Sequence, residues 1–199
     1  MCAERVHPED PAFQDRWTWR HWARSLLRWP TYVRSPWRKA FFNRYRFCQP
    51  YAVGKRVVDI PCGVGWGTSL LERTADLAGV DLSDDAARYA REHYGDKADE
   101  SLDLVMCLEG IEHVPVEVGT RFVQEAARVL VSGGRLILTN PLPDPSRPSN
   151  PYHVHECTLE EIDGLLDPCF RRERREVRQI GGVSMIYYVG VVRREDTRR

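Results

Sequence analysis

The feature that most constrains the fold is a glycine-rich turn that follows an apolar run. The stretch from Val57 to Gly67 reads VVDIPCGVGWG. Its first half predicts a buried strand, and its alternate glycines let the backbone turn sharply and let a ligand lie against the main chain. Such a turn alone is weak evidence, because it indicates no more than a generic nucleotide-binding domain.

The pattern downstream of Gly54 predicts βαβ units, because short apolar runs alternate with amphipathic segments. We therefore expect an α/β fold with a doubly wound, mostly parallel sheet that ends in an antiparallel strand pair. The expected strands are residues 56–60, 75–80, 102–107, 135–139, 170–178 and 184–193. The expected helices are residues 67–74, 84–94, 118–130 and 159–166. Residues 141–151, rich in proline, serine and asparagine, are expected to form a loop.

The length of 199 residues suits one α/β domain with an N-terminal extension. We expect residues 1–50 to form a helical, basic lid with helices at 14–29 and 37–49, and residues 51–199 to form the ligand-binding domain. Five of the six tryptophans lie between Trp17 and Trp37. The favoured interpretation is that they pack the lid onto the domain, and the alternative is a face for phosphates, anionic headgroups or a sugar ring.

The charge balance and the cysteines limit the partners and the compartment. There are 29 basic and 29 acidic residues, so the whole chain has no electrostatic bias toward nucleic acid or an anionic membrane. The six cysteines form no CxxC pair, and neither a signal peptide nor a run of about 18 apolar residues is present. We expect a reduced, cytoplasmic protein with no transmembrane segment and no nucleic-acid partner.

Two acidic residues at strand ends narrow the type of ligand. A dinucleotide-binding turn would have its third glycine at position 68, where Thr68 stands, and it does not require an acid at the strand end. Here Asp59 lies four residues before Gly63, and its carboxylate suits the ammonium group of an amino-acid tail better than a pyrophosphate. Asp81 ends the next strand and can accept hydrogen bonds from both ribose hydroxyls. The alternative for Asp81 is a helix N-cap, a role that Ser83 can fill instead.

These residues resemble the class I methyltransferases that use S-adenosylmethionine (SAM). The resemblance runs from about Arg44 to Phe170 and rests on the segments RYRFCQPYAVGKRVVDIPCG, GVDLS, LDLVMCLEGIEHV, AARVLVSGGRLILTNP and NPYHVHECTLEEI. It implies a Rossmann-like methyltransferase sheet, with residues 51–199 as the SAM-binding methyltransferase domain. By analogy, the cofactor would contact Asp59, Gly63, Gly65, Gly67, Asp81, Leu82, Leu108 and Glu109.

The chain departs from this family before its strand at residue 102. Family members place a third strand there, and an acidic turn after it holds the adenine. Only the five residues 96–100 are available, too few for a loop, a strand and a return. We therefore expect edge strand 3 to be missing. Three alternatives stay open: Asp96 or Asp99 replaces the acidic turn, cofactor binding is weakened, or the printed chain joins segments that a longer chain separates.

The candidate catalytic residues follow the strands expected at 102–107 and 135–139. Methyl transfer is an in-line displacement, so the enzyme positions the acceptor and, for a hydroxyl, removes its proton. His113 is the first candidate for the general base, with Glu112 beside it, and His155 is the second. The alternative for His113 is a structural histidine at a helix start. We expect O-methylation of a small molecule or sugar, as in the glycan and natural-product enzymes that the chain most resembles.

Other functions remain as alternatives. Glu109, Glu112 and His113, with His153 or His155, look like the metal site of small-RNA ribose 2′-O-methyltransferases, and such ligands suit Mg²⁺ or Mn²⁺. Metal-free relatives carry the same pattern, so we expect no metal. The chain could also be a methyltransferase-like binding protein with weakened catalysis, and the glycine spacing argues against an NAD-dependent enzyme. No motif indicates the acceptor or the oligomeric state.

Overall fold

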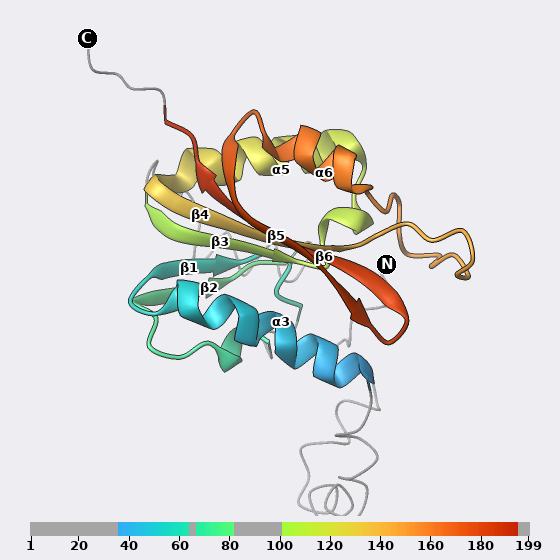
Figure 1. Cartoon of the computed structure of the whole chain (residues 1–199). Helices are drawn as coiled ribbons and strands as arrows, with labels where there is room; N and C mark the ends of the chain where they lie inside the picture. Colours follow the sequence, from blue (N-terminus) through green and yellow to red (C-terminus); the bar gives the residue numbers. More distant parts are fainter. Residues whose placement is uncertain (1–35, 64–66, 82–100, 195–199) are drawn as a thin grey trace, which may run out of the picture.

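The computed structural model describes residues 36–63, 67–81 and 101–194 (Figure 1). Its centre is a six-stranded sheet with the strand order β2-β1-β3-β4-β6-β5. The strands are β1 Arg56–Asp59, β2 Asp76–Gly79, β3 Leu102–Leu108, β4 Leu130–Pro141, β5 Phe170–Ile180 and β6 Val183–Val192. β1 pairs in parallel with β2 and β3, and β3 with β4, whereas β6 is antiparallel to β4 and β5. The predicted doubly wound sheet with its C-terminal antiparallel pair is confirmed.

The strand order reverses at β1, which has β2 on one side and β3 on the other. In open α/β sheets, ligands bind at the carboxyl ends of the strands beside such a reversal. Asp59, the last residue of β1, lies opposite Gly79 of β2 and Met106 of β3. Among the described residues, β2 is the outermost strand on its side, as expected if edge strand 3 is missing.

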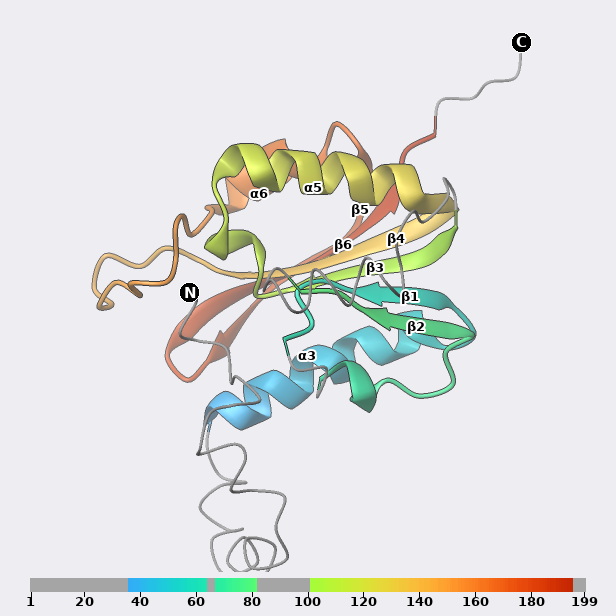
Figure 2. The same cartoon turned by 180° about the vertical axis from the view of Figure 1, so that it is seen from behind.

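Helices cover both faces of the sheet. α5 (Val116–Val129) and α6 (Leu159–Leu166) lie on one face, and α3 (Pro36–Ala52) lies on the other (Figures 1 and 2). Alternating strand residues feed two separate cores, because successive side chains point to opposite faces. Tyr188 packs in the core that contains Val123 and Ile162 of α5 and α6. Tyr187 packs in the core that contains Tyr45 of α3.

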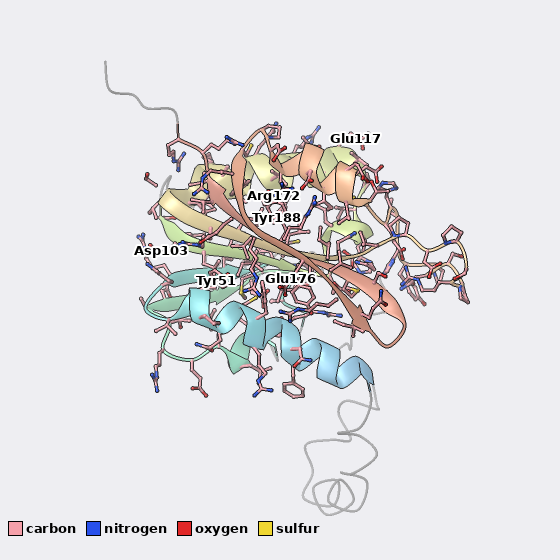
Figure 3. The ribbon with its side chains drawn as sticks, in the orientation of Figure 1. Tyr51, Asp103, Glu117, Arg172, Glu176 and Tyr188 are labelled. Atoms are coloured by element: carbon pink, nitrogen blue, oxygen red, sulfur yellow. The ribbon has the colours of Figure 1, made fainter. Side chains whose placement is uncertain are left out.

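β5 forms the outer edge of the sheet and is rich in charged residues. Arg172 of β5 donates to Asp163 of α6 at 3.0 Å on one side of the sheet. Arg174 pairs with Glu176 at 2.8 Å, and its guanidinium lies 5.0 Å from the centre of the Phe47 ring of α3. Figure 3 shows Arg172 and Glu176 at these two positions along the strand. The exposed edge is therefore lined with paired charges.

One predicted helix is wrong. Residues 67–74 form only the 3₁₀ turn η1 (Thr68–Leu70), after which Leu71 is extended and Arg73 has a φ of 57°. The cause is a contact with Gln49 of α3, which donates to the Glu72 carbonyl at 2.8 Å and accepts from the Glu72 N–H at 2.9 Å. These backbone groups are therefore bound to a side chain and do not continue a helix.

The other elements follow the prediction to within a few residues, apart from longer ends of α3 and β4. α6 has the predicted bounds, and α3 runs through the boundary expected at residue 50, with Tyr45 and Cys48 buried in the core. The helices predicted at 14–29 and 84–94 lie outside the described residues, so the lid remains a prediction. No helix in the described ranges is long and apolar enough to cross a bilayer.

Candidate functional site

The carboxylate of Asp59 lies at the end of β1 and is fully buried. Its Oδ2 accepts hydrogen bonds from the Tyr45 hydroxyl at 3.0 Å and from the Thr68 hydroxyl at 2.6 Å. Its Oδ1 is buried and has no hydrogen-bond partner in the described part of the chain. Burial raises the pKa of Asp59 from 3.8 to about 6, although both hydroxyl donors lower it. A buried carboxylate oxygen of this kind fits a cationic ligand group.

The turn after β1 brings Asp81 against the glycine loop. Gly63 has a φ of 55°, a conformation that favours glycine, and its N–H donates to Asp81 Oδ2 at 2.8 Å. Gly67 packs on the ring of Tyr45, where an added Cβ would lie 2.1 Å from two ring carbons. The structure therefore brings four of the predicted cofactor residues, Asp59, Gly63, Gly67 and Asp81, to one edge of the sheet. The predicted contacts Gly65 and Leu82 lie outside the described residues.

The loop after β3 lies against the loop after β1. The Ile60 N–H donates to the Met106 carbonyl at 2.8 Å. Gly110 packs so closely on Pro61 that an added Cβ would lie 2.3 Å from the proline Cδ. The predicted cofactor loop and the predicted catalytic segment, residues 109–113, are therefore neighbours.

The two residues predicted to lie beneath the sulfonium have different surroundings. Leu108 is buried in the core on the α3 face. Glu109 has a φ of 56°, and its Oε1 accepts from the Thr139 hydroxyl at 2.9 Å. Its Oε2 forms an ion pair with Arg44 of α3 at 3.3 Å. The Glu109 carboxylate is thus held between α3 and β4.

His113 ends the short 3₁₀ helix η2 (Ile111–His113). Its Nδ1 lies 3.0 Å from the carbonyl oxygen of Tyr152, and its ring packs edge-on against His153 with centroids 4.9 Å apart. Because a carbonyl oxygen only accepts, Nδ1 carries the hydrogen, and the lone pair of the neutral ring is on Nε2. The backbone carbonyl of Glu112 accepts from the N–H of Val154 at 2.7 Å. The loop from 142 to 158 is therefore docked onto η2.

His153 and His155 lie in separate environments. His153 Nδ1 lies 2.6 Å from Glu156 Oε1, and its Nε2 lies 3.0 Å from the side-chain nitrogen of Asn150. His155 Nε2 lies 3.0 Å from Glu161 Oε1 at the start of α6. Both nitrogens of His153 thus have partners. His113 and His155 are the two candidates for a base that the sequence analysis named.

The residues suggested as metal ligands, Glu109, Glu112 and His113 with His153 or His155, do not gather into one four-residue set. Ligand atoms of Glu112, His113 and His153 all lie within 4.8 Å of one another. Glu109 is bound instead by Arg44 and the Thr139 hydroxyl. A three-residue set is therefore present where the sequence suggested four ligands.

Sequence reasoning missed the residues that hold the acidic groups in place. Tyr45 and Thr68 bind Asp59, and Arg44 and Thr139 bind Glu109. Thr68 carried the only available signal, because it occupies the position where a dinucleotide-binding turn would have glycine. The other three lie on elements whose contacts depend on the tertiary fold.

Comparison with known proteins finds similarity to methyltransferases. Residues 58–138 match the family described as methyltransferase domain. A probable S-adenosylmethionine-dependent methyltransferase of Mycobacterium tuberculosis is 29% identical over 140 residues, which cover 61% of this chain and 50% of the relative. A ubiquinone biosynthesis O-methyltransferase of Idiomarina loihiensis is 32% identical over 104 residues, which cover 43% and 42%. The chain spans about half the length of these curated relatives.

Solved structures show the same fold. The 1,6-didemethyltoxoflavin-N1-methyltransferase of Burkholderia thailandensis, with bound S-adenosylhomocysteine, has a TM-score of 0.64 at 15% identity over 87% of this chain and 90% of that one. The magnesium protoporphyrin IX methyltransferase of Synechocystis has a TM-score of 0.57 at 19% identity over 78% and 83%. The fold is that of the SAM-dependent methyltransferases.

Proposed function

We propose that the chain binds SAM at the cradle formed by Asp59, Gly63, Gly67 and Asp81 and transfers its methyl group to a small-molecule acceptor. The observation that carries this proposal is the buried Oδ1 of Asp59, which has no hydrogen-bond partner in the described ranges. Asp59 would hold the ammonium group of SAM, and Asp81 the ribose hydroxyls. When bound, SAM supplies an electrophilic methyl group on its sulfonium. Asp59, which ends β1, and Asp81, which follows β2, would therefore bind two different polar parts of SAM, the ammonium group and the ribose.

On the acceptor side, we assign His113 as the general base for a hydroxyl group. Its Nε2 would accept the hydroxyl proton, and the Tyr152 carbonyl, 3.0 Å from Nδ1, would hold the ring in position and stabilise the imidazolium. The partial matches to ubiquinone biosynthesis O-methyltransferases support a small-molecule hydroxyl as the acceptor. Within that class, a glycan or natural-product acceptor remains our proposal from the sequence.

Cofactor binding is tested by calorimetric titration of the full chain with S-adenosylhomocysteine. Asp81→Ala should weaken binding by about 1–3 kcal/mol, because the ribose loses hydrogen bonds to a charged group. Asp76→Ala, which removes an exposed acid of β2, is the matched control and should bind as the unaltered chain does. Absence of binding to the unaltered chain would refute the SAM proposal, and unchanged affinity in Asp81→Ala would refute the ribose assignment.

The base is tested by transfer of a labelled methyl group from SAM to a panel of phenolic and sugar hydroxyls. His113→Gln should lower kcat by about 10²–10⁴-fold and leave the affinity for S-adenosylhomocysteine unchanged. His155→Gln, at the second candidate, should lower turnover far less than His113→Gln does. Loss of turnover in His155→Gln alone would move the role of base to His155.

Metal-dependent methyl transfer to an RNA ribose is the second candidate function, and one observation favours it. Glu112, His113 and His153 present ligand atoms within 4.8 Å of one another, so they could hold a divalent cation. In that case His113 would be a ligand and not a base. Methyl transfer to a short RNA that stops with a chelator and returns with Mg²⁺ or Mn²⁺ would replace the first proposal. Binding of S-adenosylhomocysteine without turnover on any acceptor would indicate a binding protein.

A further inference from the structure

A second group of potential metal ligands lies where the loop after β4 leads into α6. Ligand atoms of His155, Cys157 and Glu161 all lie within 4.8 Å of one another. His155 Nε2 is 3.0 Å from Glu161 Oε1, and Cys157 is buried. None of these three residues belongs to the cradle at Asp59 or to the set around His113. The group therefore needs an explanation of its own.

Hydrogen bonds hold the backbone around these three side chains in place. Glu161 accepts from the Thr158 N–H through Oε2 at 2.7 Å, and Thr158 Oγ1 accepts from the Glu161 N–H at 3.2 Å, which completes a capping box. The His155 N–H donates to the Glu112 carbonyl at 3.2 Å. The Cys157 carbonyl accepts from the Asn140 side chain at 3.2 Å. The three ligands thus stand on a fixed piece of backbone, as a metal site requires.

The group opens onto a pocket. His155, Cys157 and Glu161 line a cavity of about 210 Å³ together with residues of η2, α5 and α6, among them Ile111 and Leu165. A cavity of this size has room for a water molecule or another small ligand beside the three side chains. The arrangement therefore offers three protein ligands and space for a fourth ligand from outside.

We propose that His155, Cys157 and Glu161 bind a divalent cation of the Zn²⁺ class. A thiolate, an imidazole nitrogen and a carboxylate oxygen are the ligands that Zn²⁺ takes in proteins, and three of them leave one tetrahedral position open. The thiolate argues against Mg²⁺ and Ca²⁺, which take oxygen ligands. Coordination requires that Cys157 lose its proton to solvent as the metal binds.

The cation would fasten the loop from 142 to 158 to α6. The same loop supplies the Tyr152 carbonyl that lies 3.0 Å from His113 Nδ1, so the cation would support the orientation of His113 from a distance. A histidine that ligates a metal through Nε2 has no lone pair there for proton removal. Metal binding and the role of general base therefore exclude each other at His155.

The test is titration of the metal-free full chain with Zn²⁺ by calorimetry, and with Co²⁺ by absorption spectroscopy. Co²⁺ should give a near-ultraviolet charge-transfer band that reports a thiolate ligand. Cys157→Ser should abolish the band and weaken Zn²⁺ binding at least about tenfold, since loss of a ligand costs no less than loss of a supporting contact. Cys169→Ser, which removes a half-buried thiol beyond the C-terminal end of α6, should retain both signals.

A second variant separates metal binding from folding. Glu161→Gln keeps the capping box, which glutamine also forms, but removes the anionic ligand. It should weaken Zn²⁺ binding while the metal-free chain still folds, with a slightly lower unfolding midpoint because a charge at the start of α6 is lost. Glu160→Gln, which removes the neighbouring charge of the same turn, is its matched control. Unchanged Zn²⁺ affinity in Cys157→Ser, or a Co²⁺ spectrum without the thiolate band, would overturn the proposal. Titration with S-adenosylhomocysteine tests the cradle separately, so either proposal can fail alone.

Discussion

The ionisation of Asp59 gives a direct prediction for how stability depends on pH, because its buried charge destabilises the ligand-free protein. Burial raises the pKa of its carboxyl from 3.8 to about 6. Below about pH 4 the group is protonated in both the folded and the unfolded chain, so it has no effect there. Between about pH 4 and pH 6 the unfolded chain ionises first, and the free energy of unfolding falls by about 3 kcal/mol. Above about pH 6 the free energy of unfolding stays lower by this full amount.

Asp59→Asn removes the charge and keeps an oxygen that can accept from Tyr45 and Thr68. The new amide N–H₂ replaces the partnerless Oδ1, and an unsatisfied buried donor costs about 1 kcal/mol or more. We therefore expect the variant to be about 2 kcal/mol more stable than the unaltered chain near pH 8, and no more stable near pH 4. The same variant should bind S-adenosylhomocysteine weakly, because the ammonium group loses its anionic partner.

The measurement is urea unfolding of the ligand-free chain and of Asp59→Asn at several pH values from about 4 to about 8. Asp76→Asn, an exposed acid of the neighbouring strand, is the control and should follow the unaltered chain at every pH. Parallel pH profiles for the chain and Asp59→Asn would refute the reasoning. So would a variant that is less stable near neutral pH.

Two further predictions concern the residues that surround Asp59. Tyr45→Phe removes a hydrogen bond that lowers the pKa of Asp59, so the pH at which S-adenosylhomocysteine binding reaches half its maximum should rise. A calorimetric pH series tests this, and an unshifted midpoint would contradict it. Gly67→Ala places a methyl group 2.1 Å from the Tyr45 ring and should destabilise the chain by about 1–3 kcal/mol, measured by urea unfolding. Gly164→Ala, which adds a methyl group in open space on α6, is its control, and equal losses would reject the packing argument.

The sequence predicted the elements whose signals are local. The strand at Val57, the turn at Gly63 and the acid at Asp81 follow from apolar pattern and spacing. α6 was predicted at its observed bounds, and the capping box that begins it, formed by Thr158 and Glu161, lies within the segment itself. Such signals can be read from the sequence because they depend on residues that are close neighbours in the chain and not on tertiary contacts.

The prediction failed where a distant contact decides the conformation. The helix expected after the glycine loop is replaced by a 3₁₀ turn and an extended segment, because the Gln49 side chain of α3 binds the backbone N–H and carbonyl of Glu72. The same limit explains why Tyr45 was not recognised as the partner of Asp59. His153 and His155 show the limit within one short loop, since two residues of separation place them in different networks.

The charged edge at β5 has a consequence for how copies of the chain behave at high concentration. An open sheet edge presents unpaired backbone groups that can recruit another strand. Here Arg172 and Arg174 lean toward opposite faces and are held there by Asp163 and Glu176. β5 carries five arginines and only two glutamates, so the strand keeps an excess of positive charge, and a second β5 approaching this edge would bring the same excess against it. Edge-to-edge pairing, the usual first step toward insoluble β-aggregates, is therefore opposed by charge repulsion along the strand.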